Sequence, residues 1–292
     1  MRHRSVLRTS AVATALLLIA AAAQAKSFGW KVTSKSGGVV YLIGSVHLLS
    51  SDFYPLQPPL EAAYKDSDLL VEEVDMAELT DPTAQLALLG KAMLPSATPL
   101  DKVISAETYA MLSKRATALG LPLEPFKMLK PWMVALTLVQ LEWQQAGFDP
   151  QLGLDKHFYD QAKADGKSTQ GLETAEYQIS RLDGLTMDQQ ERMLAESLKE
   201  LDDEKANMKK LVDAWRAGDT ATVEKIVLAD LKAEPLLYQR LLVERNHNWM
   251  PKIEALFARP KHALVVVGAA HLIGPDGLLA ALKAKGYTIE QL

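Results

Sequence analysis

The sequence predicts an α/β protein with one mixed sheet, built from βαβ-like portions at the two ends of the chain, and a large helical insertion between them. Three observations support this fold. Strand-like apolar runs occur near both ends, amphipathic helical segments fill the middle, and the same short motif follows an apolar run at each end. Neither end has enough strands for a sheet of its own, so we expect one shared sheet. Two α/β lobes joined by helices are the alternative.

The start of the chain has the pattern of a secretory signal peptide. Three arginines precede an apolar stretch over residues 11–23, and Ala23-Gln24-Ala25 follows it. The apolar stretch is shorter than the roughly 20 residues that a bilayer span needs, and small residues fit a peptidase site. We expect residues 1–25 to be removed and residues 26–292 to form a single domain. The mature protein would be periplasmic or secreted, without an integral membrane segment.

Composition excludes several kinds of chemistry. The chain has no cysteine, which excludes disulfides, a lipid-modified N-terminus, thiol nucleophiles and thiolate metal ligands. Removing the three signal-peptide arginines from the 32 Lys and Arg leaves 29 basic against 36 acidic residues, a net charge of −7. This balance argues against nucleic acid as a partner.

The N-terminal part predicts a strand, a helix and a further strand. Two strand-like runs at 28–34 and 39–43 flank Lys35-Ser36-Gly37-Gly38, which suits a hairpin turn. A helix over 56–66 and an apolar strand over 68–75 follow. The order of strand, helix and strand predicts a parallel pair with the helix laid across it.

The C-terminal part repeats this pattern. A strand over 263–267 precedes a helix over 276–285, which Gly286 ends, and a last strand over 287–291. The insertion, at about 82–260, contains one further short strand at 168–172. Its helices are predicted from apolar residues at three-and-four spacing, over 83–93, 106–119, 128–145, 154–164, 174–182, 187–216, 220–229 and 235–257.

The motif at both ends is Gly-x-x-His. Gly44-Ser45-Val46-His47 and Gly268-Ala269-Ala270-His271 each follow a buried strand pattern and precede two aliphatic residues. Each histidine should therefore lie just beyond a strand end, where α/β proteins place their sites. A single histidine in such a setting is more often structural. The duplication leads us to expect that His47 and His271 belong to one site.

A carboxylate is predicted beside the histidines. The strand over 68–75, expected next to the first histidine strand, ends with Glu72 and Glu73. Side chains alternate along a strand, so only one of these two can face His47. Two imidazoles and one carboxylate are a common ligand set for zinc, manganese, cobalt or iron. The alternative is a solvated acidic turn.

Four further residues in the insertion are candidates. Asp155 opens a helix, and Glu173 ends the short predicted strand, so either could supply a further ligand or a general base. Arg245 and Asn246 could orient a carboxylate or bind a substrate carbonyl. Each also has a structural interpretation, as a charge at a helix N-terminus or part of a solvated helical face. For His157 we favour a structural role.

Other families of site are absent from the sequence. It contains no His-Glu-x-x-His, Gly-x-Ser-x-Gly, Walker loop or Gly-rich dinucleotide turn. The tryptophans at 132, 143, 215 and 249 stand at helical spacing among aliphatic residues, which indicates core or cleft wall.

The order of these motifs resembles the TraB/GumN family, and the chain looks like a GumN-type bacterial member. The resemblance covers nearly the whole mature sequence and is carried by 41–47, 54–56, 70–75, 153–155, 171–174, 244–246 and 265–274. The family is related to the Tiki proteins, which are metal-dependent proteases, and more distantly to erythromycin-esterase-like hydrolases. The resemblance implies a metal-dependent hydrolase fold whose site uses both Gly-x-x-His histidines and a strand-end glutamate. By its place in Leu-Val-Glu-Glu-Val-Asp, that glutamate is Glu73.

We therefore expect an exported, peptidase-like, metal-dependent hydrolase acting on a peptide or protein. Manganese, cobalt or zinc would be held by His47, His271 and Glu73, with Asp155 as an additional ligand, while Glu173 serves as a general base. Arg245 and Asn246 would stabilise the oxyanion or anchor the substrate. One alternative is metal-free hydrolysis, with one histidine as general base and Glu73 orienting it. The other is a non-catalytic binding or regulatory protein. Whether His47, Glu73 and His271 converge is the decisive geometric question.

Overall fold

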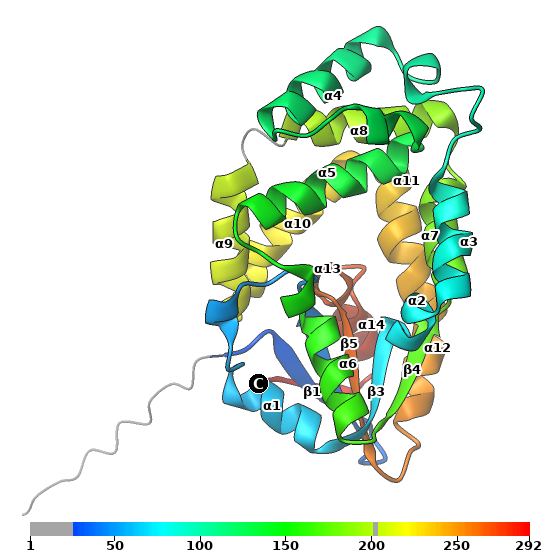
Figure 1. The fold of residues 1–292 in the computed structure, drawn as a ribbon. Coiled ribbons are helices and arrows are strands. Elements are labelled where there is room, and N and C mark those ends of the chain that lie inside the picture. Colours follow the sequence, from blue (N-terminus) through cyan, green and yellow to red (C-terminus); the bar gives the residue numbers. More distant parts are fainter. Residues whose placement is uncertain (1–25, 201–203) are drawn as a thin grey trace, which may run out of the picture.

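The computed structural model describes residues 26–200 and 204–292, and it contains one six-stranded sheet surrounded by helices (Figure 1). The predicted signal peptide lies outside the described residues. Within the described part, no helix has the length and apolar character that crossing a bilayer requires. The strands are β1 (Gly29–Thr33), β2 (Val39–Ser45), β3 (Ser67–Val74), β4 (Ser168–Glu173), β5 (His262–Gly268) and β6 (Thr288–Gln291).

Strands from both ends of the chain form this sheet, as predicted. Its order is β4-β3-β5-β2-β1-β6. The strands β4, β3, β5 and β2 are mutually parallel, whereas β1 runs antiparallel to both of its neighbours. The fold class is therefore α/β with a mixed sheet, and the predicted hairpin is the β1–β2 pair.

The expected pairing of the first histidine strand with the glutamate strand is wrong. The two strands, β2 and β3, are parallel to each other, but β5 lies between them and pairs with each. Residues 263–267 of β5 are completely buried, and a run that is apolar on both faces is most stable at the centre of a parallel sheet. Glu73 therefore stands beside the second histidine strand rather than the first.

Helices cover both faces of the sheet. On one face lie α1 (Pro58–Lys65) and α6 (Leu154–Ala164), which stack through Tyr64 and Phe158. On the other lie α12 (Glu244–Leu256) and α14 (Leu278–Ala284), which are joined by the Lys285–Glu254 ion pair. This layering sends alternate β3 side chains into two different environments.

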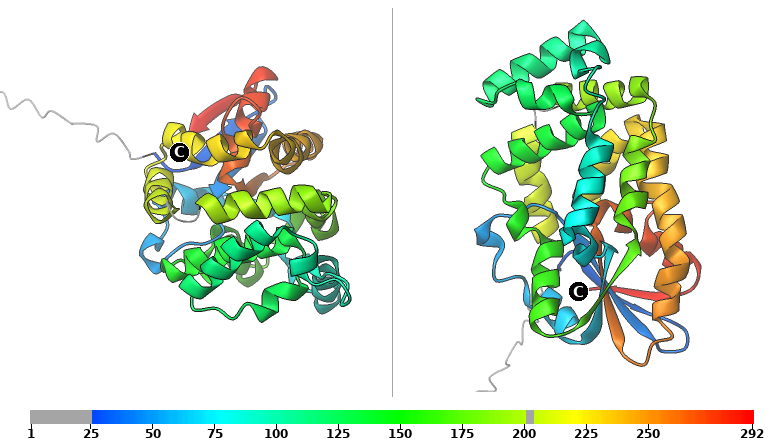
Figure 2. Two further views of the ribbon diagram at one scale, coloured as in Figure 1. Left: turned by 90° about the horizontal axis from the view of Figure 1, so that it is seen from above. Right: turned by 45° about the vertical axis from the view of Figure 1, so that its right-hand side comes forward.

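The helical region between β3 and β5 extends beyond one end of the sheet (Figures 1 and 2). Three of its helices, α4 (Ala106–Ala118), α5 (Pro131–Gln145) and α8 (Met187–Glu200), share a separate apolar cluster that includes Leu112, Leu138 and Leu194. Of the predicted helix 187–216, the structure describes the parts Met187–Glu200 and Glu204–Arg216, and residues 201–203 lie outside the described residues. The predicted helix 128–145 begins only at Pro131, because proline favours the first helical turn. Other helices of this region are α2 (Met76–Thr80), α3 (Pro82–Ala92), α7 (Ala175–Asp183), α9 (Glu204–Arg216), α10 (Thr220–Ala233) and α11 (Pro235–Tyr238), which continues through a π turn into α12.

Candidate functional site

The two Gly-x-x-His turns lie side by side at the carboxyl end of the sheet. β2 and β5 pair in register, with Ser45 opposite Gly268, so both turns leave the sheet at neighbouring points. A Cβ atom added at Gly268 would lie 3.2 Å from Glu73 Oε1, 3.6 Å from His271 Cδ2 and 3.9 Å from His47 Nε2. The three residues singled out from the sequence therefore surround one glycine, which leaves room between them.

Glu73 is held as a carboxylate. Its Oε1 accepts the Gly268 N–H at 2.8 Å, and its Oε2 accepts from Arg245 Nη2 at 2.5 Å and from Gln178 Nε2 at 3.0 Å. Burial alone would raise the pKa of this carboxyl. The Arg245 guanidinium and the Gly268 N–H outweigh burial and hold the Glu73 pKa well below its usual range.

Glu72 points to the opposite face of β3, as alternation requires. It is buried, and neither of its carboxyl oxygens has a hydrogen-bond partner among the described residues. Burial, with the nearby charge of Asp155, raises the pKa of Glu72 to about 9, so this side chain is neutral at pH 7. Only Glu73 faces the histidines.

His271 lies on α13 (Ala269–Leu272), a short helix directly after β5, and its tautomer follows from its partners. Asn246 Nδ2 donates to the His271 and Asp276 carbonyls at 3.1 and 2.9 Å, which turns Asn246 Oδ1 toward His271 Nδ1 at 2.7 Å. Nδ1 must therefore carry the proton, and Nε2 accepts from Arg245 Nη1 at 3.1 Å. Burial lowers the pKa of His271 to about 3, so the ring is neutral.

His47 has the opposite environment. Its side chain is 62% exposed, and its Nδ1 lies 2.8 Å from Asp155 Oδ2. The start of α6 reaches this turn because Gly153 has no side chain: a Cβ there would lie 2.1 Å from the His47 carbonyl oxygen. The Asp155 carboxylate raises the pKa of His47, although water around the exposed ring screens the effect.

Arg245 joins the polar groups of the site. Besides Glu73 and His271, it contacts Glu173, with Nη2 2.8 Å from Oε1. Trp249 Nε1 donates to the other Glu173 oxygen at 2.8 Å. The Arg245 and Glu173 side chains are 7% and 4% exposed, so this is a buried ion-pair network. Burial raises the pKa of Glu173, and the contacts with Arg245 and Trp249 oppose that rise.

A mostly apolar cavity of about 540 Å³ opens onto His47, Glu73, Arg245 and His271. Helices α5, α9 and α10 form its wall, and Trp215 Nε1 fixes α9 to the first histidine strand by donating to the Gly44 carbonyl at 2.7 Å. The remaining lining residues are Ser45, Val46, Leu48, Leu136, Val139, Gln140, Trp143, Leu211, Trp215, Val223, Val227, Gly268, Ala269 and Ala270.

Sequence reasoning found some of these groups and missed others. Trp143 and Trp215 line the cavity, whereas the tryptophans at 132 and 249 are completely buried. Both outcomes fit the prediction of core or cleft wall. Gln178 and the aliphatic wall were missed, because helical spacing shows which residues are buried but not which cavity they face. Asp155, Glu173 and Asn246 reach the centre through other side chains, as the partners of His47, Arg245 and His271.

The imidazole and carboxylate groups at this centre are of types that bind a divalent metal. Their present arrangement fits such an ion less well. His271 Nε2 and Glu73 Oε1 lie 3.7 Å apart, close enough to share one ion. Arg245 nevertheless hydrogen-bonds to both residues. Among residues 26–200 and 204–292, no group of three His, Cys, Asp or Glu side chains is arranged to hold a metal. A metal at this place would have to displace Arg245 from His271 Nε2.

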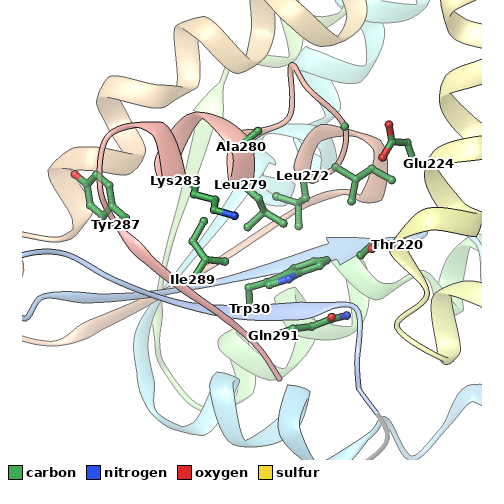
Figure 3. A pocket seen from close by; sticks show the side chains of 12 residues that line it. Trp30, Thr220, Glu224, Leu272, Leu279, Ala280, Lys283, Tyr287, Ile289 and Gln291 are labelled. Carbon is green, nitrogen blue, oxygen red and sulfur yellow. The ribbon is translucent and has the colours of Figure 1, made fainter.

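A second cavity, of about 380 Å³, lies beside β6 and α14 (Figure 3). A different set of residues lines it, with Trp30, Leu279 and Ile289 on its apolar side and Lys283 and Glu224 among its polar groups. The paired histidines belong to the first cavity, which is therefore the candidate site.

The sequence model of the TraB/PrgY/gumN family matches residues 28–291. The chain belongs to this family. It is also 28% identical over 243 residues to "Uncharacterized protein YbaP" of Escherichia coli strain K12, covering 83% of this chain and 87% of that protein. The Shigella flexneri protein of the same description gives the same values. No solved structure matches the chain. The family predicted from the motifs is confirmed.

Proposed function

We propose that this TraB/PrgY/gumN protein is an exported, metal-dependent hydrolase whose reaction centre is formed by His47, Glu73 and His271. The observation that carries the proposal is the meeting of these three side chains around Gly268, from the ends of three adjacent parallel strands. They also lie at the edge of a cavity large enough for a small-molecule-sized group.

Each of the three side chains is held by an outer partner. Asp155 binds His47, Asn246 binds His271, and the Gly268 N–H binds Glu73. Such partners fix tautomers and ring orientations in metal sites. A manganese, cobalt or zinc ion held by the three side chains would polarise the substrate carbonyl and lower the pKa of a bound water.

The other polar residues have supporting roles in this proposal. Arg245, once it leaves His271 Nε2, is the nearest cation for a developing oxyanion, and Glu73 and Glu173 keep it in place. Asn246 is a positioning residue, because its amide is fully engaged with the His271 ring and two backbone carbonyls. A peptide or protein amide is the substrate that the family resemblance favours.

One observation favours metal-free hydrolysis as a second candidate. His47 Nδ1 pairs with Asp155, which leaves Nε2 on the side of Gly268 and Glu73. A histidine oriented by a carboxylate is a common general base. Here Asp155, rather than Glu73, would orient that base. Arg245 would keep its hydrogen bond to His271, and the activity would survive chelation.

The test combines metal analysis and hydrolysis assays on the mature chain and on His47→Ala, Glu73→Gln and His271→Ala. We expect each variant to lose bound metal and about 1,000-fold in kcat/KM on peptide and ester substrates. His262→Ala is the matched control, because His262 begins the same strand β5 and pairs with Asp66 at 2.8 Å. This control variant should keep its bound metal and its hydrolytic activity.

Three results would lead to other conclusions. Unchanged metal content and hydrolysis in all three variants would refute the proposed centre. Activity that resists chelation but disappears in His47→Ala would select the metal-free mechanism. Specific peptide binding without turnover would select the non-catalytic binding or regulatory protein.

A further inference from the structure

The wall and the floor of the main cavity differ in chemistry. Its wall is formed by aliphatic and indole side chains of α5, α9 and α10, whereas its charged groups gather at the strand ends around Gly268. A fitting ligand would therefore have one polar, reactive end and a long apolar body.

The family resemblance favours a peptide or protein substrate, but a peptide backbone is poorly matched to this wall. Every buried peptide unit brings an N–H and a C=O that cost free energy when they find no partner. Away from the charged floor, hydrogen bonding from the lining side chains is limited to Gln140, Ser45 and the Trp143 indole, since Trp215 already donates to the Gly44 carbonyl. A hydrocarbon chain makes no such demand.

The charges of the floor favour a neutral carbonyl over a free carboxylate. Arg245, the arginine that lines the cavity, is shared between Glu73 and Glu173 at 2.5 and 2.8 Å. A substrate carboxylate would have to compete with both acids and would lie against the Glu73 charge. An ester or amide carbonyl carries no such charge.

We propose that the cavity holds a medium-length acyl chain, so that the protein hydrolyses neutral acyl esters or acyl amides. This inference rests on the proposed hydrolase function and names its substrate class. Water oxygen bonds to the acyl carbon, the bond from that carbon to oxygen or nitrogen breaks, and the alcohol or amine leaves with a proton. A volume of about 540 Å³ is in the range of pockets that enclose ligands of this size.

The first arm of the test measures kcat/KM for p-nitrophenyl acetate, butyrate and octanoate, and for the corresponding p-nitroanilides. Each methylene that enters the apolar cavity should raise kcat/KM about fourfold, so the four methylenes from butyrate to octanoate should together give about 250-fold. The anilide series separates amide from ester as the preferred bond. Faster cleavage of phenylalanyl peptides than of octanoyl compounds would overturn the proposal.

The second arm fills the cavity. Val139→Trp should reduce the octanoate-to-acetate ratio of kcat/KM at least tenfold, whereas Gln144→Trp, an exposed position on the same helix, should keep the wild-type ratio. Calorimetry with octanamide supplies a readout that needs no turnover. Suppose that the protein hydrolyses none of these compounds but binds octanamide, and that Val139→Trp abolishes this binding. That result would support the acyl-chain site and refute the hydrolase function. If the protein hydrolyses these compounds but shows no chain-length preference and does not bind octanamide, only the acyl-chain site is refuted.

Discussion

The two Gly-x-x-His turns have nearly the same sequence but different surroundings. Both follow buried parallel strands that pair with each other. The His47 side chain is 62% exposed and pairs with a carboxylate, whereas that of His271 is 8% exposed and pairs with the Asn246 amide. One ring therefore gains affinity for a proton, while burial keeps the other ring neutral.

This difference shows that the motif specifies position rather than protonation. Glycine and two small residues bring both imidazoles to one place, and residues from the helical insertion then set their chemistry. In the proposed hydrolase, His271 is the metal ligand that is already neutral at pH 7, and His47 is the histidine that its carboxylate partner makes easier to protonate.

The largest effect should come from Arg245, which contacts His271 but not the Asp155–His47 pair. Arg245→Met leaves Glu73 and Glu173 as uncompensated buried acids, and we expect it to lower the free energy of unfolding by about 3–5 kcal/mol. Urea denaturation measures this loss. The matched control, Arg216→Met, breaks an exposed pair with Asp52 and should lower the free energy of unfolding far less than Arg245→Met does. Equal losses in the two variants would mean that the network contributes little.

The pH dependence of stability should separate the two histidines. The unfolded His271 binds a proton below about pH 6.5 but the folded one only near pH 3, so its contribution to stability is present above pH 6.5 and is lost as pH falls. At pH 4.5 the loss should be about 2–3 kcal/mol, and His271→Gln should remove it.

His47 should show the opposite sign. Its raised pKa contributes stability that is present below about pH 6.5 and is lost as pH rises through the folded value. Because the ring is exposed, His47→Gln should change stability at pH 5 by less than about 1 kcal/mol. Thermal denaturation at several pH values measures both variants, and the same slope for both would contradict the assignment of environments.

Effects smaller than that of Arg245 should come from the outer partners of the two histidines. Asn246→Ala and Asp155→Ala should each lower kcat/KM by about 10- to 100-fold. Only Asp155→Ala should move the acidic limb of the pH profile to lower pH, because it removes the carboxylate that raises the His47 pKa. Asp160→Ala, on the same helix and paired with Lys156, is the control. Identical pH profiles for Asp155→Ala and Asn246→Ala would show that Asp155 has only a structural role.

Local patterns were enough to predict much of this molecule. The strand ends follow from periodicity, and alternation along the strand shows that only one of Glu72 and Glu73 can face the histidines. The resemblance to the family then selects Glu73. The position of β5 between β2 and β3 does not follow from local patterns, because strand order depends on pairing between residues about 200 positions apart.

The same reason explains what was missed at the site. Arg245, Asn246 and Asp155 were recognised as candidates, but their contacts with particular partners depend on how α12 and α6 pack against the sheet. The apolar cavity is likewise formed by helices that no local pattern places above the strand ends.

The central claim is that His47, Glu73 and His271 form one metal-dependent reaction centre. Anomalous diffraction from crystals soaked in manganese tests it most directly. We predict one manganese peak bonded to Nε2 of both imidazoles and to the Glu73 carboxylate, with Arg245 moved away from His271. Imidazoles that point into separate environments, or manganese bound only elsewhere, would contradict it.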